Sequence, residues 1–240
     1  MVNTVGSCET KHWQKHWIPI KASLHLTLEQ RAVIIGSLLG DGTMRIGEGA
    51  KNANFKVEQG LDQKEYVEWK YSFLKPFVFT GPKISCRYRE NGEQYAKSWW
   101  FRTIRHQILT EIYEQFYLGE KYRTGRKIIP ASMKQDLTPL ALATWIMDDG
   151  SYQKEKIDIS TYSFSLKEIR FLQKCLKNAY EIEAAYYRDR DKGHSIYFKK
   201  RETEKLIQII HPYIIPSMMY KIGFHNPVTT GFPLFAKKAG

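Results

Sequence analysis

The stretch Ile34-Ile35-Gly36-Ser37-Leu38-Leu39-Gly40-Asp41-Gly42 has a counterpart in Leu142-Ala143-Thr144-Trp145-Ile146-Met147-Asp148-Asp149-Gly150. The first carries no charge until it ends in Asp-Gly, and the second carries none until it ends in Asp-Asp-Gly. The first follows a capping-box pair, Thr27 and Gln30, and the second follows Thr138-Pro139, which puts proline at the first helical position. One Asp-Gly after a helix is most simply a C-terminal turn. Two copies instead predict a pair of closely packed helices that each end at an acidic residue.

Similar elements follow both helices, so the chain nearly repeats itself. Each copy continues with strands, a helix, a hairpin and a last helix, and closes with Ile-Ile-Pro. The expected segments are strands at 54–59 and 157–160, helices at 62–77 and 165–180, hairpins at 83–102 and 185–199, and last helices at 104–118 and 203–213. Asp62 with Glu65 and Ser165 with Glu168 are the expected caps of the second helices.

This order predicts an α/β (α+β) fold made of two αββαββα halves related by a pseudo-twofold axis. The halves would pack through the two motif helices, and each would carry an antiparallel sheet. The expected organisation is an N-terminal extension at 1–25, a first half at 26–135, a second half at 136–225 and a C-terminal tail at 226–240. Whether the extension is an extra DNA-contacting arm or a disordered tail stays open.

The composition indicates a basic protein that meets a polyanion. The 240 residues include 37 Lys and Arg against 25 Asp and Glu, for a net charge of +12. Phosphate neutralisation makes nucleic acid the first partner to expect, although a merely soluble basic protein would look similar. No apolar run is long enough to span a membrane and no signal peptide is expected. The three cysteines form no disulfide framework, and Cys8, His12 and His16 lack an obvious fourth zinc ligand.

The two acidic helix ends predict a cation site. If the motif helices pack together, Asp41 and Asp149 emerge side by side, which is unfavourable unless a cation lies between them. Carboxylate oxygens suit Mg²⁺, which keeps several waters and accepts phosphate oxygens from a substrate. Such a centre is suited to phosphodiester hydrolysis.

The two motifs resemble those of the LAGLIDADG homing endonucleases, over roughly residues 26–225. The monomeric, two-motif, intron-encoded branch is the most similar, through Trp145 to Gly150 and through 215–221. Ser37 and Leu39 depart from the name motif, as does Thr144, and these changes affect helix packing rather than the carboxylates.

The resemblance also implies the site. Its metal ligands would be the carboxylates of Asp41 and Asp149 with the backbone carbonyls of Gly40 and Asp148. The remaining catalytic positions would be Lys127 and Lys221, as active-site lysines, and Gln59 and Ser160, as polar groups that hold solvent around the metals. Because Ser160 is shorter than Gln59, the two strand cuts would be unequal.

The implied activity is a metal-dependent, staggered double-strand break across the minor groove of a long asymmetric DNA target, with a short 3′ overhang. Mg²⁺ would be the cofactor, with Mn²⁺ as a substitute. A monomer would straddle double-stranded DNA with two saddle-shaped sheets. The alternative is an RNA-binding group I intron maturase on the same scaffold, whose partner would be the host intron RNA. The expected compartment is an organelle, mitochondrion or chloroplast, or a bacterial cytoplasm.

DNA contacts can be predicted from the hairpins without the resemblance. From Lys83 to Arg89 the odd positions are polar or basic and the even ones apolar, so one face should be charged while the other packs. A two-stranded ribbon fits the major groove, although a solvated face would show the same pattern. The expected DNA-contacting residues are Lys83, Ser85, Arg87, Arg89, Lys97, Arg102, Arg123, Arg126, Arg188, Arg190, Lys192 and Lys199. The Trp99-Trp100-Phe101 run is expected to pack in the protein rather than to stack on bases.

Overall fold

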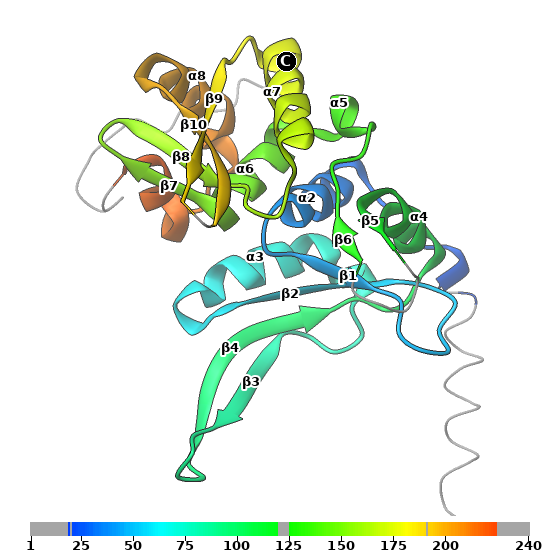
Figure 1. Ribbon diagram of the computed structural model, residues 1–240. Helices are drawn as coiled ribbons and strands as arrows, with labels where there is room; N and C mark the ends of the chain where they lie inside the picture. Colours follow the sequence, from blue (N-terminus) through cyan, green and yellow to red (C-terminus); the bar gives the residue numbers. More distant parts are fainter. Residues whose placement is uncertain (1–18, 20, 120–124, 191, 225–240) are drawn as a thin grey trace, which may run out of the picture. The chain divides into compact units, whose positions relative to one another are not determined.

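The computed structural model describes residues 19, 21–119, 125–190 and 192–224 (Figure 1). Two compact units make up the chain. Unit 1 consists of Met1–Ile34 with Gly42–Arg126, and unit 2 consists of Ile35–Asp41 with Lys127–Gly240. The last part of the first motif helix therefore belongs to unit 2.

The helices and strands of unit 1 are α2 (Leu28–Leu39, whose end lies in unit 2), β1 (Thr43–Arg45), β2 (Asn54–Gly60), η1 (Leu61–Gln63), α3 (Lys64–Leu74), η2 (Lys75–Phe77), β3 (Lys83–Tyr88), β4 (Gln94–Arg102), α4 (Gln107–Phe116) and β5 (Tyr117–Leu118). At the boundary lies β6 (Arg126–Lys127), and unit 2 continues with α5 (Met133–Asp136), α6 (Pro139–Asp149), β7 (Gly150–Gln153), β8 (Lys156–Ser160), α7 (Leu166–Tyr180), β9 (Ala184–Asp189), β10 (Gly193–Phe198), α8 (Lys200–Ile210), η3 (His211–Tyr213) and η4 (Pro216–Ile222).

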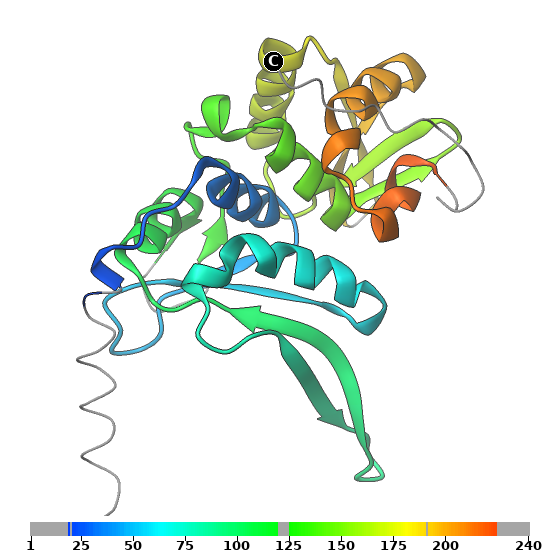
Figure 2. The same cartoon turned by 180° about the vertical axis from the view of Figure 1, so that it is seen from behind.

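Both units contain a four-stranded antiparallel sheet with the same order of strands. Unit 1 has the order β1-β2-β4-β3, and unit 2 has β7-β8-β10-β9. In unit 1, α3 lies along one face of the sheet (Figure 1). In unit 2, α7 contacts β9 and α8 contacts β8 and β10, and Figure 2 shows these elements from behind. The predicted α/β fold with antiparallel sheets and an internal repeat is confirmed.

Local capping chemistry starts the motif helices as predicted. The Thr27 backbone N–H donates to Gln30 Oε1 at 2.9 Å, and the Gln30 N–H donates to Thr27 Oγ1 at 3.2 Å. Thr138 caps α6 by accepting from the Ala141 N–H at 3.2 Å, and a proline follows it. These bonds satisfy backbone donors that the first turn of a helix leaves unpaired.

The second helices differ in how they begin. Ser165 and Glu168 form the predicted capping box of α7. The expected cap at Asp62 is wrong, because residues 61–63 form a turn of 3-10 helix and α3 starts only at Lys64. Gln63 occupies the N-cap position of α3, and its side chain does not accept a hydrogen bond from the first turn. The predicted cap therefore lies one residue before the observed N-cap position.

The β3–β4 hairpin also departs from its predicted pattern. Its even positions were expected to pack, but Ile84 is 49% exposed, Tyr88 is 71% exposed, and Cys86 is exposed too. The register shifts between Ser85 and Cys86, which marks a β-bulge. The outer part of the hairpin extends away from α3 (Figure 1), so none of the described helices of unit 1 covers its apolar side.

The core of each unit lies between its sheet and its helices. In unit 1 the inward side chains of β2 and β4 include Phe55, Val57 and Phe101, all at most 1% exposed. In unit 2 the inward side chains include Ile159 and Ile196, which are fully buried. Among the residues that the structure describes, no helix combines the length and the apolar character needed to cross a membrane.

Candidate active site and nucleic-acid interface

Within unit 2, the end of α2 lies directly against α6. A Cβ atom added at Gly36 would be 2.3 Å from the Ala141 carbonyl oxygen and 2.7 Å from Thr144 Cβ. One added at Gly40 would be 2.5 Å from Asp148 Cβ. Only glycine permits such an approach between helix backbones. The small residues of the first motif therefore bring the two acidic helix ends together, as the sequence predicted.

Three carboxyl groups lie near the ends of the two motif helices. Asp41 is exposed, Asp149 is half-buried, and Asp148 is only 7% exposed. The Asp41 backbone N–H donates to Asp148 Oδ2 at 3.4 Å. Burial raises the pKa of Asp149 to about 7, and the charges of Asp41 and Asp148 add to that rise, although Lys127 and Lys221 oppose it. The carboxyl of Asp149 is thus costly to ionise in the protein alone, mainly because it is buried.

Two lysines occupy equivalent positions beside the carboxylates. Lys127 Nζ donates to the Gly40 carbonyl at 2.7 Å, and Lys221 Nζ donates to the Asp148 carbonyl at 3.1 Å. Each lysine therefore holds the carbonyl of the residue that precedes a motif aspartate. Burial lowers the pKa of Lys221, which makes its proton easier to give up.

The donor set fits a divalent cation of the hard class. The exposed carboxylate of Asp41 lies close enough to the half-buried carboxyl of Asp149 to raise its pKa, and carboxylates and carbonyls are the ligands of Mg²⁺. Within the described ranges, no three His, Cys, Asp or Glu side chains form a cluster able to enclose a metal. An open site that shares its ion with water and phosphate oxygens fits this arrangement. The carbonyls of Gly40 and Asp148, which accept from lysines here, have a second lone pair to offer, and their role as ligands stays a prediction.

The raised pKa of Asp149 predicts a measurable cost in stability. Its folded pKa of about 7 lies above its ordinary value of 3.8, so the folded protein keeps a proton that the unfolded chain loses. The free energy of unfolding should therefore fall as the pH rises between these values. We expect Asp149→Asn, without metal and above pH 7, to raise the free energy of unfolding by about 1–3 kcal/mol.

Chemical denaturation at several pH values measures this effect. The gain from Asp149→Asn should shrink toward acidic pH, where the wild-type carboxyl is protonated. Millimolar Mg²⁺ should also stabilise the wild type more than the variant. An equal free energy of unfolding for both proteins at every pH would show that Asp149 ionises without cost.

The two predicted solvent-holding residues lie on the strands after each motif. Antiparallel pairing puts Ile159 opposite Gly150, and Ser160 is one residue further along β8, level with Asp149. Ser160 is exposed. Gln59 is half-buried in β2 of unit 1. Their roles in holding solvent stay predictions.

The predicted DNA contacts of the first hairpin share the face of the sheet that points away from α3. Lys83 is paired with Trp100, Ser85 with Ser98, and Arg102 with Lys56. Lys97 lies at the bulge and reaches the same face. The residues involved are Lys83, Ser85, Arg87, Lys97 and Arg102, and Arg89 follows at the end of the strand. The charged half of the predicted alternation is thus present, although its apolar half is exposed.

The second hairpin differs from the prediction. Arg188 is paired with His194, two residues before buried Ile196, so it shares the face that the helices cover. Arg190 has a φ of 41° and lies in the turn, next to Lys192. These basic residues surround the tip of the hairpin instead of lining one face, because strand β9 ends at Asp189.

The last predicted contacts lie between elements. Lys199 is exposed and caps the start of α8. Arg126 is exposed in β6. Arg123 lies outside the described residues, as do Cys8, His12 and His16.

Sequence reasoning missed a polar cluster on the first sheet. Glu58 accepts hydrogen bonds from Lys56 and Ser98, and Lys97 Nζ lies 3.7 Å from its Oε1. Lys56 and Ser98, in that order, hold the pKa of Glu58 below its ordinary value. Trp100 lies on the same face, with the Nζ of Lys56 5.2 Å from its ring centroid. The alternation of residues 54–59 was the signal that placed Glu58 outward.

Comparisons with known proteins identify the family. Residues 31–206 match the model of the LAGLIDADG DNA endonuclease family. The chain belongs to this family. It is 33% identical over 206 residues to the cytochrome b mRNA maturase bI2 of Saccharomyces cerevisiae. The aligned region covers 82% of this chain and 48% of the maturase. The chain thus spans about half the length of this relative.

Two further similar proteins are matched over nearly their whole length. DNA endonuclease I-ChuI of Chlamydomonas applanata is 28% identical over 214 residues, covering 85% of this chain and 98% of that protein. The homing endonuclease I-WcaI, solved bound to its DNA recognition sequence, superposes with a TM-score of 0.75 at 23% identity. That superposition covers 94% of this chain and 96% of I-WcaI, and it shows that the two proteins share a fold.

Proposed function

We propose that this protein is a homing endonuclease that makes a metal-dependent, staggered double-strand break in a long asymmetric DNA target. The observation that carries the proposal is the pairing of Asp41 with Asp149, each beside a lysine-bound carbonyl. A protein that only bound nucleic acid would gain nothing from a carboxyl whose pKa is raised to about 7 by burial and, to a lesser degree, by two neighbouring carboxylates. The names of its endonuclease relatives support the same activity.

The residues of the site would have different roles in phosphodiester hydrolysis. A divalent cation held by Asp41 and Asp149, when bound, would polarise the scissile phosphate and lower the pKa of a water. Lys127 and Lys221 would stabilise the negative charge that grows on phosphate oxygens in the transition state. Because burial lowers the pKa of Lys221, this residue would also serve as a proton donor to a leaving oxygen. We propose Mg²⁺ as the ion, with Mn²⁺ as a substitute, because every donor here is oxygen.

DNA binding would use the exposed face of the first sheet and the basic tip of the second hairpin. A net charge of +12 supports backbone contacts, which release counterions. Side chains of the first hairpin, such as Arg87 and Lys97, would read base edges in the major groove. We propose that a single chain carries both motifs and acts as a monomer.

Cleavage of a library of intron-insertion-site duplexes tests this function. We expect cuts at one site, with a defined stagger, in Mg²⁺ and none in EDTA. Sequencing of the product ends supplies the target site. Tight binding without any cut, in the presence of Mg²⁺ or Mn²⁺, would contradict the proposal.

The second candidate is an intron maturase, favoured by the 33% identity to a mRNA maturase. Such a protein would bind its host intron RNA on the same scaffold and would need no carboxylate pair. Splicing of the host intron with and without the protein separates the two activities. Accelerated splicing together with no DNA cleavage would move the assignment to the maturase.

A further inference from the structure

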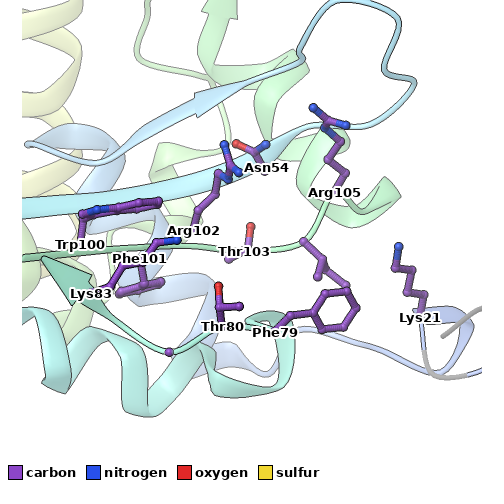
Figure 3. Close-up of a pocket in the computed structure, with 12 residues that line it drawn as sticks. Lys21, Asn54, Phe79, Thr80, Lys83, Trp100, Phe101, Arg102, Thr103 and Arg105 are labelled. Carbon is purple, nitrogen blue, oxygen red and sulfur yellow. The ribbon is translucent and has the colours of Figure 1, made fainter. Parts of the chain in front are cut away.

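Unit 1 contains a pocket of about 410 Å³ that no predicted site includes. It lies at the end of β4, against the turn that precedes β3 and the short helical segment around Lys21 (Figure 3). The pocket is lined by Lys21, Asn54, Phe79, Thr80, Gly81, Lys83, Trp100, Phe101, Arg102, Thr103, Ile104 and Arg105. Only Lys83 and Arg102 belong to the DNA contacts predicted above.

All the charged side chains that line the pocket are positive. Four cations, Lys21, Lys83, Arg102 and Arg105, border the pocket, and its lining contains no Asp or Glu. In the part of the chain that the structure describes, neither arginine forms an ion pair. Cations gathered without counter-charges repel each other unless an anion binds among them. The pocket therefore suits an anionic ligand.

Asn54 provides an independent sign of a missing partner. It is only 3% exposed, and its Oδ1 atom has no hydrogen-bond partner among the described residues. Figure 3 shows its amide directed into the pocket beside the side chain of Arg102. A buried amide oxygen without a hydrogen-bond partner destabilises the fold, so this atom is suited to bind a ligand group or a water. Because the amide oxygen and nitrogen can exchange places, Asn54 offers either an acceptor or a donor.

The remaining wall is apolar. Phe79 is 48% exposed, and Lys21 Nζ lies 5.8 Å from its ring centroid. A ligand with an anionic part and an adjoining apolar ring would therefore satisfy the whole pocket. A backbone phosphate of DNA with its deoxyribose has this chemistry, and the volume accommodates one such unit.

We propose that this pocket anchors one backbone phosphate of duplex DNA, together with its sugar, separately from the phosphates that are cut. This inference rests on the proposed function, since it assumes that DNA binds the exposed face that Lys83 and Arg102 share. Arg102 and Arg105 contact the phosphate oxygens, and Phe79 packs against the sugar. Such a contact adds affinity and fixes the position of the duplex without reading its sequence.

Fluorescence anisotropy with a duplex of arbitrary sequence, about 30 base pairs long, tests the anchor, because backbone binding needs no recognition site. We expect Arg105→Ala to weaken binding about fivefold to tenfold and to reduce the slope of log K against log salt by about 1. Arg170→Ala is the matched control, since Arg170 is exposed on α7 and lies outside every proposed contact. It should leave affinity and slope unchanged.

Nuclear magnetic resonance locates the contact. The side-chain amide signal of Asn54 should shift when the duplex is added to the wild type, and the shift should be smaller with Arg105→Ala. Two results would overturn the anchor: equal binding by Arg105→Ala and Arg170→Ala, or an Asn54 signal that only intron RNA moves. Neither result would contradict the proposed endonuclease activity of the carboxylate site, because cleavage by the wild type is measured in a separate assay.

Discussion

In the Asp149→Asn variant we expect DNA cleavage to fall about a thousandfold or more, while the affinity for DNA stays within about threefold of the wild type. Asn keeps the shape of the side chain but removes the charge that attracts a divalent cation. Burial and the neighbouring carboxylates also raise the pKa of Asp149 to about 7. The same substitution at Asp41 should have a similar effect, because the two carboxylates act on one another.

Single-turnover cleavage and a binding assay in Ca²⁺ measure the two quantities separately. Asp136→Asn is the matched control, since Asp136 lies on α5 and belongs to neither motif helix. It should cleave like the wild type. Cleavage by Asp149→Asn at the rate of the control would remove Asp149 from the site.

Gly36→Ala should lower the free energy of unfolding by about 3 kcal/mol. The added methyl would lie 2.3 Å from the Ala141 carbonyl oxygen, which belongs to the backbone of α6 and cannot rotate away. The two helices would have to separate, and the acidic helix ends would move with them. Cleavage should therefore decline even at temperatures where the variant stays folded.

Ser37→Ala, one residue further along the helix, should change the free energy of unfolding in the opposite direction. Ser37 is fully buried, and its hydroxyl has no hydrogen-bond partner among the residues described. Removing it should raise the free energy of unfolding by about 1 kcal/mol, because a buried unpaired hydroxyl is unfavourable. Thermal and urea denaturation of both variants provide the measurement. Equal stabilities for Gly36→Ala and the wild type would refute the close helix packing.

Much of the fold could be predicted because its signals are local. Thr27, Thr138 and Ser165 mark helix starts through bonds that span three residues. Because the chain repeats itself, the order of helices and strands in one half predicts the order in the other. The β-bulge at Ser85 could not be predicted in this way, because it depends on how two strands pair. The exposed side of that hairpin likewise depends on where α3 ends.

The candidate site was predictable only in part. The motif aspartates follow uncharged helical stretches, and that pattern is visible in the sequence. The Lys127 and Lys221 contacts join residues 87 and 73 positions apart, so only the resemblance indicated them. The anchor pocket combines Lys21, Asn54 and Arg105 from three separate segments. No spacing in the sequence relates these residues, and only the folded chain brings them together.

The most direct test of the account counts bound metal ions. Paramagnetic resonance of free Mn²⁺, titrated into the protein with its DNA target, measures the number of ions held. We predict that the wild type binds Mn²⁺ at the paired carboxylates, and that Asp41→Asn and Asp149→Asn together abolish this binding while the DNA stays bound. Undiminished Mn²⁺ binding by that double variant would contradict the assignment of Asp41 and Asp149 as the metal site.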